Sequence, residues 1–131
     1  MDKPLTNEEQ TGLRVLGEML GDDFAGQIER RCADDAVGVA MTRNALQSTF
    51  AGVWGRPGLD RRSRSLVTLG VLIAAGALDE LAKHFEIALR HGISAAELEE
   101  VVMQAQPYVG FAAAGPAMQL LSKILAGRKQ D

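Results

Sequence analysis

Two histidines are the first residues in this 131-residue chain whose type and spacing could support proton transfer. In a helix, His84 and His91 would share nearly one face, and Glu80 joins that face four residues before His84. A carboxylate beside the imidazole would raise the pKa of His84 toward a value useful for general acid catalysis. The alternative is an ordinary surface contact between Glu80 and His84, with His91 acting as a cation near the end of a helix.

A cluster of arginines follows the single tryptophan, Trp54. Arg56, Arg61, Arg62 and Arg64 fall within nine residues of one another. Guanidinium groups at the amino terminus of a helix suit a small carboxylate. The alternative is a solvated basic turn that pairs with acidic residues elsewhere. Arg62 extends the apolar stripe of the helix that follows, so we expect it to point inward and to require a partner or a ligand.

Several other kinds of site lack the residues that they need. Cys32 is the one cysteine and lies in a charged stretch, so we expect no internal disulfide, no thiol-rich metal site and no activated thiol. Metal-ligand spacing, a nucleophile elbow and a glycine-rich phosphate loop are all absent, so we expect neither a metal nor a cofactor. Trp54 and Tyr108 could line a pocket, although filling of the core is the simpler explanation for both.

The composition is that of a folded globular protein. Charged residues make up 24%, hydrophobic residues 47%, and the net charge of −3 gives no broad basic face for nucleic acid. The first residues lack the basic-then-apolar order of a secretory signal, so we expect a cytoplasmic protein. The uncharged run 66–78 is shorter than the roughly 20 residues of a membrane span and predicts a buried core helix.

Helical spacing runs through the first part of the chain. Thr6 and Glu9 form a capping box before a helix that ends at Gly21, and Asp22-Asp23 is expected to cap a short second helix. From about residue 37 the pattern predicts one amphipathic helix to Trp54. The positions expected on its buried stripe are Met41, Ala45, Leu46, Thr49, Phe50, Val53 and Trp54.

The same spacing continues after a proline-glycine turn. Asp60 is placed to cap an apolar helix, and Ser94 with Glu97 forms a second capping box. Between them we expect a helix over 80–91, and after them Pro107 and Gly110 are expected to interrupt the chain before a last helix. No segment alternates as a strand does. The fold class is therefore all-α, a single compact domain over residues 1–131 with about six to seven helices.

The residues around the arginine cluster resemble a known family. The run WGRPGLDRRSRSLVTL over 54–69, then Glu80-Leu81 with His84, then 88–93 and 97–102, is similar to the carboxymuconolactone decarboxylase family, most of all to its protocatechuate-pathway branch. The resemblance covers nearly the whole chain. It implies an all-helical domain that assembles into trimers or hexamers, in agreement with the helical spacing.

A second branch of that family, the alkylhydroperoxidase-like proteins, uses the thiol motif C-x-x-C-x₃-H. When His84 is placed on the histidine of that motif, the two cysteine positions are Ala77 and Glu80, and the upstream glutamate of the branch falls at Ser65. The resemblance therefore implies the alkylhydroperoxidase-like fold without thiol peroxidase activity.

The resemblance implies a carboxy-lyase of aromatic catabolism that converts 4-carboxymuconolactone into 3-oxoadipate enol-lactone and carbon dioxide without a cofactor. Such a site must grip a second carboxylate, stabilise an enolate and return a proton to carbon. We hypothesise that Arg62 and Arg64 grip the carboxylate while His84 donates the proton or stabilises the enolate. The candidates for substrate binding are Trp54, Arg56, Glu80, Gln104 and Tyr108.

Two positions depart from that branch of the family. Gln104 stands where the branch usually carries a histidine, and Tyr108-Val109-Gly110 replaces a Tyr-Cys-Gly sequence. Two alternatives therefore stay open: the same scaffold catalysing another reaction, such as that of a cyclase or isomerase, and a non-catalytic oligomeric ligand-binding protein. The expected partners are a small carboxylate or lactone and further copies of the chain, with neither nucleic acid nor a membrane.

Overall fold

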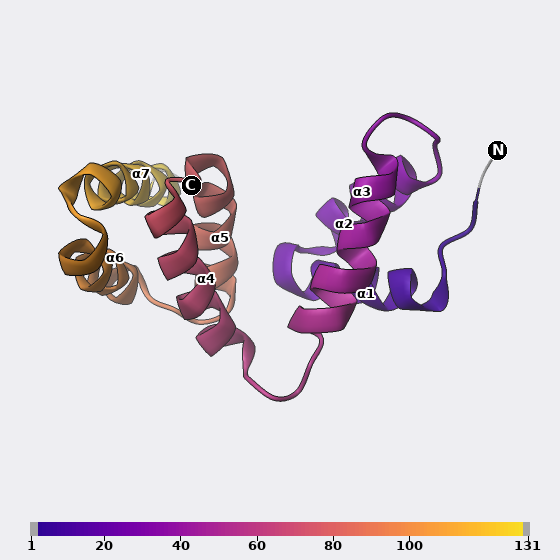
Figure 1. Ribbon diagram of the computed structural model, residues 1–131, viewed down its shortest axis with the longest axis horizontal. Coiled ribbons are helices and arrows are strands. Elements are labelled where there is room, and N and C mark those ends of the chain that lie inside the picture. The colour runs from indigo at the N-terminus through magenta and orange to yellow at the C-terminus, as the bar shows by residue number, and fades with distance from the viewer. Residues whose placement is uncertain (1–2, 130–131) are drawn as a thin grey trace. The chain divides into compact units, whose positions relative to one another are not determined.

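The computed structural model describes residues 3–129 and confirms the all-α fold class in that range. Seven α-helices and one π-helical segment are present there, and no strand. The chain forms two compact units, Met1–Leu59 and Asp60–Asp131 (Figure 1), and each has buried core residues of its own. The single domain expected over residues 1–131 stays a prediction.

The first unit consists of four helical segments in chain order. They are α1 (Asn7–Leu20), α2 (Asp22–Cys32), α3 (Val39–Ala45) and η1 (Leu46–Trp54). The predicted capping box begins α1, because the Glu9 N–H donates to Thr6 Oγ1 at 3.2 Å and the Thr6 N–H donates to Glu9 Oε2 at 2.8 Å. Helix α1 packs closely along η1, and a β-carbon at Gly12 would overlap the backbone carbonyl of Leu46. The absence of a side chain at Gly12 therefore permits this close approach.

The helix expected from residue 37 to Trp54 differs from the prediction in its second half. At Leu46 the chain enters wider π-helical turns, and the segment closes with the Gly55 N–H donating to the Phe50 carbonyl, five residues back, at 2.8 Å. Each of these turns holds more residues than an α-helical turn. Leu46, Phe50 and Trp54, which follow one another at a spacing of four, are therefore at least half-buried, whereas a residue three positions after one of them faces outward. The predicted stripe is wrong at three exposed positions, Met41, Thr49 and Val53.

The second unit consists of four α-helices. They are α4 (Arg61–Ala75), α5 (Leu78–Arg90), α6 (Ala95–Val109) and α7 (Phe111–Arg128). Both predicted caps are confirmed, since the Ser63 N–H donates to Asp60 Oδ2 at 3.2 Å and the Glu97 N–H donates to Ser94 Oγ at 3.1 Å. Helix α4 packs against all three of the others. The core includes Leu69, Ile73, Leu81, Phe85, Leu98, Val102, Ala117 and Leu121.

One predicted helix start is wrong, and one predicted interruption is right only in part. Gly21 is the N-cap of α2, and the carboxylates of Asp22 and Asp23 lie within its first turn, where the helix dipole favours them. Of the two residues predicted to interrupt the chain, Pro107 lies inside α6, whereas Gly110, with φ +84°, ends that helix after Val109. Because proline has no N–H, α6 lacks one backbone hydrogen bond in its last turn.

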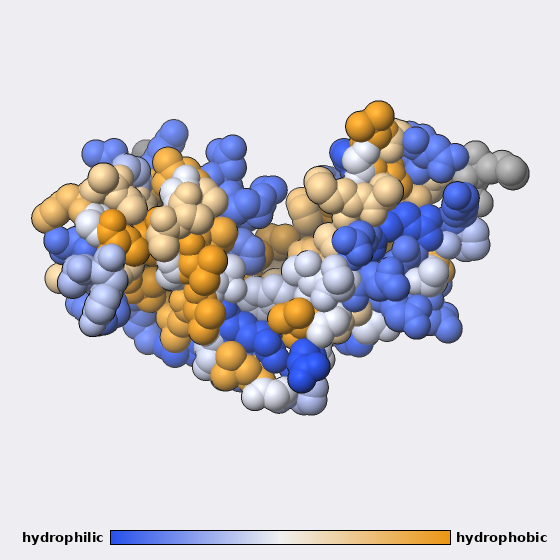
Figure 2. Space-filling view, in the orientation of Figure 1, coloured by the Kyte–Doolittle hydropathy of each residue, from blue (hydrophilic) through white to orange (hydrophobic). Residues whose placement is uncertain are grey.

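Apolar side chains also reach the surface of the second unit along α4 (Figure 2). Val67 and Val71 are each 61% exposed, one turn apart on the same helix. The opposite face of α4 carries the buried Leu69 and Ile73. Helix α4 therefore packs on the core of the second unit by one face and exposes apolar side chains on the other.

Candidate active site

The amino end of α4 carries three residues of the arginine cluster. Asp60 caps the helix, and Arg61, Arg62 and Arg64 lie in its first turn, all half-buried. Arg62 Nη2 donates to Glu97 Oε2 in the first turn of α6. The Arg62 and Glu97 side chains are 41% and 48% exposed, so the expectation that Arg62 points inward is wrong. The partner that its charge requires is nevertheless present, because Glu97 supplies the carboxylate.

An open groove of about 490 Å³ runs between α4 and α6 in the second unit. Its lining residues are Arg62, Leu66, Gly70, Glu97, Glu100, Val101, Gln104 and Ala105. Two of the predicted site residues, Arg62 and Gln104, therefore open onto one surface. Leu66 and Val101 give that surface an apolar part, beside the charged groups contributed by the first turns of both helices.

Tyr108 lies one turn beyond Gln104 on α6 but is not among the residues that line the groove. Its side chain is 83% exposed, so the prediction that Tyr108 fills the core is wrong. Val109 takes the position that packs on the core at the end of α6. Since neighbouring positions on a helix point in different directions, Tyr108 is turned to the surface.

His84 lies on α5 with its imidazole half-buried and its Nδ1 atom enclosed by protein. Burial lowers the pKa of His84 below its ordinary value of 6.5, and the carboxylate of Glu80 opposes that effect without reversing it. Glu80 is exposed and accepts a hydrogen bond from Lys83 Nζ at 3.3 Å. The prediction that Glu80 raises the pKa of His84 is therefore wrong in its net direction, and the imidazole is neutral near pH 7.

Sequence reasoning missed one buried polar pair, formed by Ser65 and His91. Ser65 is fully buried on α4, and its Oγ lies 2.8 Å from Nδ1 of His91, the residue that follows α5. Burial lowers the pKa of His91, and the positive charge of Arg61 lowers it further. The signal in the sequence was Ser65 itself, which precedes Leu69 and Ile73 at a spacing of four on a stripe that is otherwise apolar.

The polar residues of α4 contact two different helices. Arg62 faces α6 and shares its groove with Gln104, whereas Ser65 bonds to the end of α5. His84 is not among the residues that line the groove. Arg64 is half-buried, and its backbone carbonyl accepts a hydrogen bond from Thr68 Oγ1 at 2.9 Å.

Comparison with known proteins identifies the family. The model of the carboxymuconolactone decarboxylase family matches residues 39–123, well over half of the chain. A protein of Acinetobacter baylyi named 4-carboxymuconolactone decarboxylase is 34% identical over 123 residues, which cover 90% of this chain and 89% of the relative. The chain belongs to the carboxymuconolactone decarboxylase family.

Two further relatives show how varied similar proteins are. Nitrosuccinic acid decarboxylase of Metarhizium robertsii is 32% identical over 133 residues, covering 95% of this chain and 90% of the relative. An uncharacterised 15.0 kDa protein of Paracoccus denitrificans is 27% identical over 88 residues, which is 66% of each chain. The two names that state an activity both describe a decarboxylation, of different acids.

The first unit holds the two other predicted site residues, Trp54 and Arg56. Trp54 is buried at the end of η1, as filling of the core predicts, and Arg56 is exposed in the turn after it. Across residues 3–129, no three side chains of the metal-ligating types gather closely enough to hold a metal ion. Within the same residues, no helix is both long enough and apolar enough to cross a membrane.

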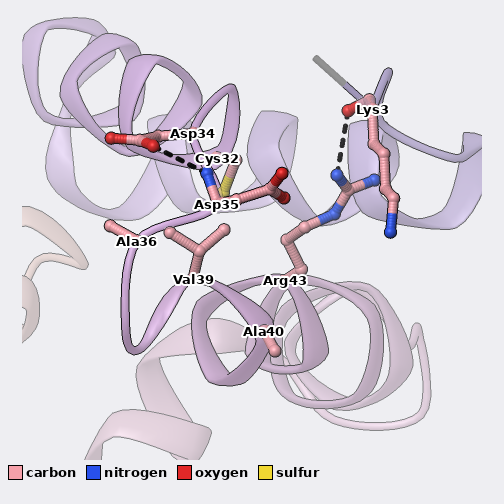
Figure 3. Close-up of a pocket in the computed structure, with 8 residues that line it drawn as sticks. All are labelled: Lys3, Cys32, Asp34, Asp35, Ala36, Val39, Ala40 and Arg43. Carbon is pink, nitrogen blue, oxygen red and sulfur yellow. Dashed lines mark hydrogen bonds between the residues drawn. The ribbon is translucent and has the colours of Figure 1, made fainter. Parts of the chain in front are cut away.

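A smaller cavity of the first unit, about 270 Å³, contains the one cysteine of this family member (Figure 3). Arg43 borders this cavity and makes four hydrogen bonds: Nε and Nη2 donate to Glu9 at 3.1 and 2.6 Å, Nη1 to the Lys3 carbonyl at 2.9 Å and Nη2 to the Pro4 carbonyl at 2.8 Å. Burial raises the pKa of the Cys32 thiol. Because the Arg43 guanidinium already makes four hydrogen bonds and the Cys32 thiol stays protonated, this cavity is a poor candidate for an active site.

Proposed function

We propose that this protein is a decarboxylase of a small dicarboxylic acid, namely 4-carboxymuconolactone or a related unsaturated lactone or acid. The observation that carries the proposal is the arrangement of the second unit, where three arginines begin α4 and the adjacent α5 holds a half-buried, neutral imidazole. Decarboxylation of such an acid needs both kinds of group, because one carboxylate must be held while the other leaves.

The chemistry of the two acids named for the relatives supports this substrate class. Carboxymuconolactone and nitrosuccinic acid each carry two carboxyl groups and a group that can accept electrons, a lactone carbonyl in one and a nitro group in the other. When the carbon–carbon bond to the leaving carboxylate breaks, its electron pair moves toward that accepting group. Carbon dioxide leaves, and one proton returns to carbon. The balanced reaction consumes no oxidant or reductant.

The arginines of α4 would grip the carboxylate that stays on the substrate. Arg62 and Arg64 are the candidates. Arg62 borders the open groove between α4 and α6, and because His84 does not line that groove, the substrate would have to reach from Arg62 toward α5. A guanidinium holds a carboxylate by two parallel hydrogen bonds, which fixes orientation as well as charge. Since Arg62 already bonds to Glu97, a substrate carboxylate would have to share or displace that partner.

His84 would act on the developing enolate. The lowered pKa keeps the ring neutral near pH 7, so its N–H would serve as a hydrogen-bond donor to the electron-accepting oxygen. Of the two roles that the sequence left open, stabilising the enolate therefore fits the structure better than acting as a strong acid. Because the ring is neutral, His84 could give a proton to carbon only after it had first taken one up.

The position of Gln104 favours a second candidate, another reaction on the same scaffold. Gln104 lines the groove beside Arg62, at the place where a related branch usually carries a histidine. An amide donates and accepts hydrogen bonds but cannot exchange protons as an imidazole does. A site with Gln104 would therefore suit a cyclisation or isomerisation that needs orientation more than acid catalysis.

Incubation of the purified protein with 4-carboxymuconolactone, and separately with nitrosuccinic acid, tests these alternatives. The proposal expects release of carbon dioxide from one of them, with His84→Gln lowering kcat about 100-fold or more. Arg14→Gln is the matched control, because Arg14 belongs to an exposed ion pair with Glu18 in the first unit. If neither acid releases carbon dioxide, the decarboxylase proposal fails; a product of unchanged mass would support the cyclase or isomerase.

We also propose that the protein works as a homo-oligomer. Val67 and Val71 form an exposed apolar strip on α4, which a second copy could bury. Light scattering at micromolar concentration should give a mass of two or more times the 14.0 kDa of one chain. A monomeric mass would contradict this expectation.

A further inference from the structure

The hydrogen bond between Ser65 and His91 joins the arginine-bearing end of α4 to the carboxyl end of α5. Ser65 Oγ lies 2.8 Å from His91 Nδ1, and Ser65 is fully buried. One imidazole therefore ties α4 to the end of α5, in the stretch of α4 that also carries Arg62 and Arg64.

His91 is badly placed to exchange a proton with a substrate. Its Nδ1 is engaged by Ser65, and its Nε2 is enclosed by protein. Burial and the positive charge of Arg61 on α4 lower the pKa of His91 more than the Arg61 backbone raises it, and His84 on α5 lowers it as well. A ring whose nitrogens are both enclosed is suited to holding neighbouring elements in place.

The position of a guanidinium tip depends on how α4 is rotated about its axis. Arg62 and Arg64 reach away from the helix on long, flexible side chains, so a small rotation of α4 displaces their charged ends further than its backbone. The hydrogen bond between Ser65 and His91 restrains that rotation next to the turn where the arginines stand. Loss of about 1 Å in such placement is enough to weaken a site severely.

We propose that Ser65 and His91 are positioning residues, whose hydrogen bond holds the first turns of α4 so that Arg62 and Arg64 can bind a dicarboxylate. This inference rests on the proposed function for the identity of the ligand. It expects substrate affinity to depend on the pair, while the imidazole of His91 takes no part in proton transfer.

Four variants measured by titration calorimetry with succinate, a stable dicarboxylate, test the inference apart from turnover. Ser65→Ala and His91→Leu should weaken succinate binding about tenfold, which corresponds to the loss of about one hydrogen bond between the displaced arginines and the ligand. His91→Asn should restore wild-type affinity, because its amide places a hydrogen-bonding atom near the position of Nδ1. Ser122→Ala, at an exposed position on α7, is the matched control and should bind as wild type does.

Kinetics on the decarboxylation substrate give a second readout. Ser65→Ala should raise KM about tenfold with kcat nearly unchanged, since a grip on the non-reacting carboxylate serves ground state and transition state alike. The pH profile of His91→Asn should match that of the wild type. Far-UV circular dichroism establishes that each variant is folded, and if His91→Leu does not fold, Ser65→Ala decides.

The outcomes separate the two proposals. Wild-type affinity in folded Ser65→Ala, or a His91→Asn variant as impaired as His91→Leu, would overturn the positioning role. So would a wild-type protein that does not bind succinate. Absence of carbon dioxide release from a protein that binds succinate in the expected pattern would overturn the proposed function and leave the positioning role standing.

Discussion

Arg62 and Glu97 form an ion pair between the first turn of α4 and the first turn of α6. Glu97 has a second role, because its Oε1 accepts a hydrogen bond from the Ser94 N–H at 3.1 Å in the capping box of α6. One carboxylate therefore caps a helix and holds a guanidinium proposed to bind substrate. A substrate carboxylate would compete with Glu97 for Arg62.

Glu97→Gln should strengthen substrate binding, whereas Arg62→Gln should weaken it. Glutamine can close a capping box as glutamate does, so α6 keeps its amino terminus while the charge that competes for Arg62 disappears. We expect KM to fall several-fold in Glu97→Gln and to rise about tenfold or more in Arg62→Gln. Steady-state kinetics measure both, and unchanged KM in both variants would remove Arg62 from the proposed site.

The stability of the protein should fall as the pH drops below the ordinary histidine range. Burial lowers the pKa of both His84 and His91 in the folded state, so the unfolded chain binds more protons below about pH 6.5. The histidine contribution is fully present above that pH and is lost as the pH falls toward the folded pKa values. Urea unfolding between about pH 5 and pH 7.5 measures this slope.

The variant His84→Gln isolates the part that belongs to His84. Glutamine does not titrate, so the slope of stability against pH should become shallower, and His91→Asn should flatten it further. Lys123→Gln, at an exposed position on α7, is the control and should leave the slope largely unchanged. A steeper slope in His84→Gln would show that burial does not disfavour the charged imidazole.

Local sequence signals predicted most of the helix ends. Asp60, Ser94 and Thr6 cap helices as expected, because a side-chain oxygen next to a free backbone N–H is a contact within three residues. The π-helical turns of η1 were not predictable in this way. An apolar stripe at a spacing of three and four fits an α-helix equally well, and the wider turns that expose Thr49 and Val53 have no mark in the sequence.

The candidate site was predictable by residue type but not by environment. The spacing of Glu80 and His84 predicted a raised pKa, and the burial that reverses it depends on helices from the rest of the second unit. The partner of Arg62 lies 35 residues away, and Ser65 and His91 are 26 apart. Contacts at these separations depend on how helices pack, which periodicity alone does not specify.

Gly12→Ala should destabilise the first unit. A methyl group at Gly12 would overlap the backbone carbonyl of Leu46, and neither backbone can yield without separating α1 from η1. We expect a loss of about 1–3 kcal/mol in the free energy of unfolding. Gly26→Ala on α2 is the matched control, because its new β-carbon would meet only the flexible end of Arg30, at 3.4 Å.

Chemical denaturation followed by circular dichroism measures the two glycine variants. Gly26→Ala should be neutral or gain up to about 1 kcal/mol, since alanine is the better helix former. Equal stabilities for Gly12→Ala and Gly26→Ala would contradict the close packing of α1 on η1. A loss of stability in Gly12→Ala alone would locate the effect at the contact between α1 and η1.

Cys32 should be unreactive in the folded protein. Its side chain is buried, and burial raises the pKa of the thiol, so little thiolate is present at neutral pH. A disulfide reagent such as dithionitrobenzoate should label native protein slowly and urea-unfolded protein at once. Cys32→Ala should keep the decarboxylase activity of the wild type, and neither protein should consume hydrogen peroxide with a thiol reductant. Rapid labelling of the native thiol, together with peroxide consumption that Cys32→Ala abolishes, would contradict this prediction. It would indicate thiol peroxidase activity although Ala77 and Glu80 stand at the two cysteine positions of the thiol motif.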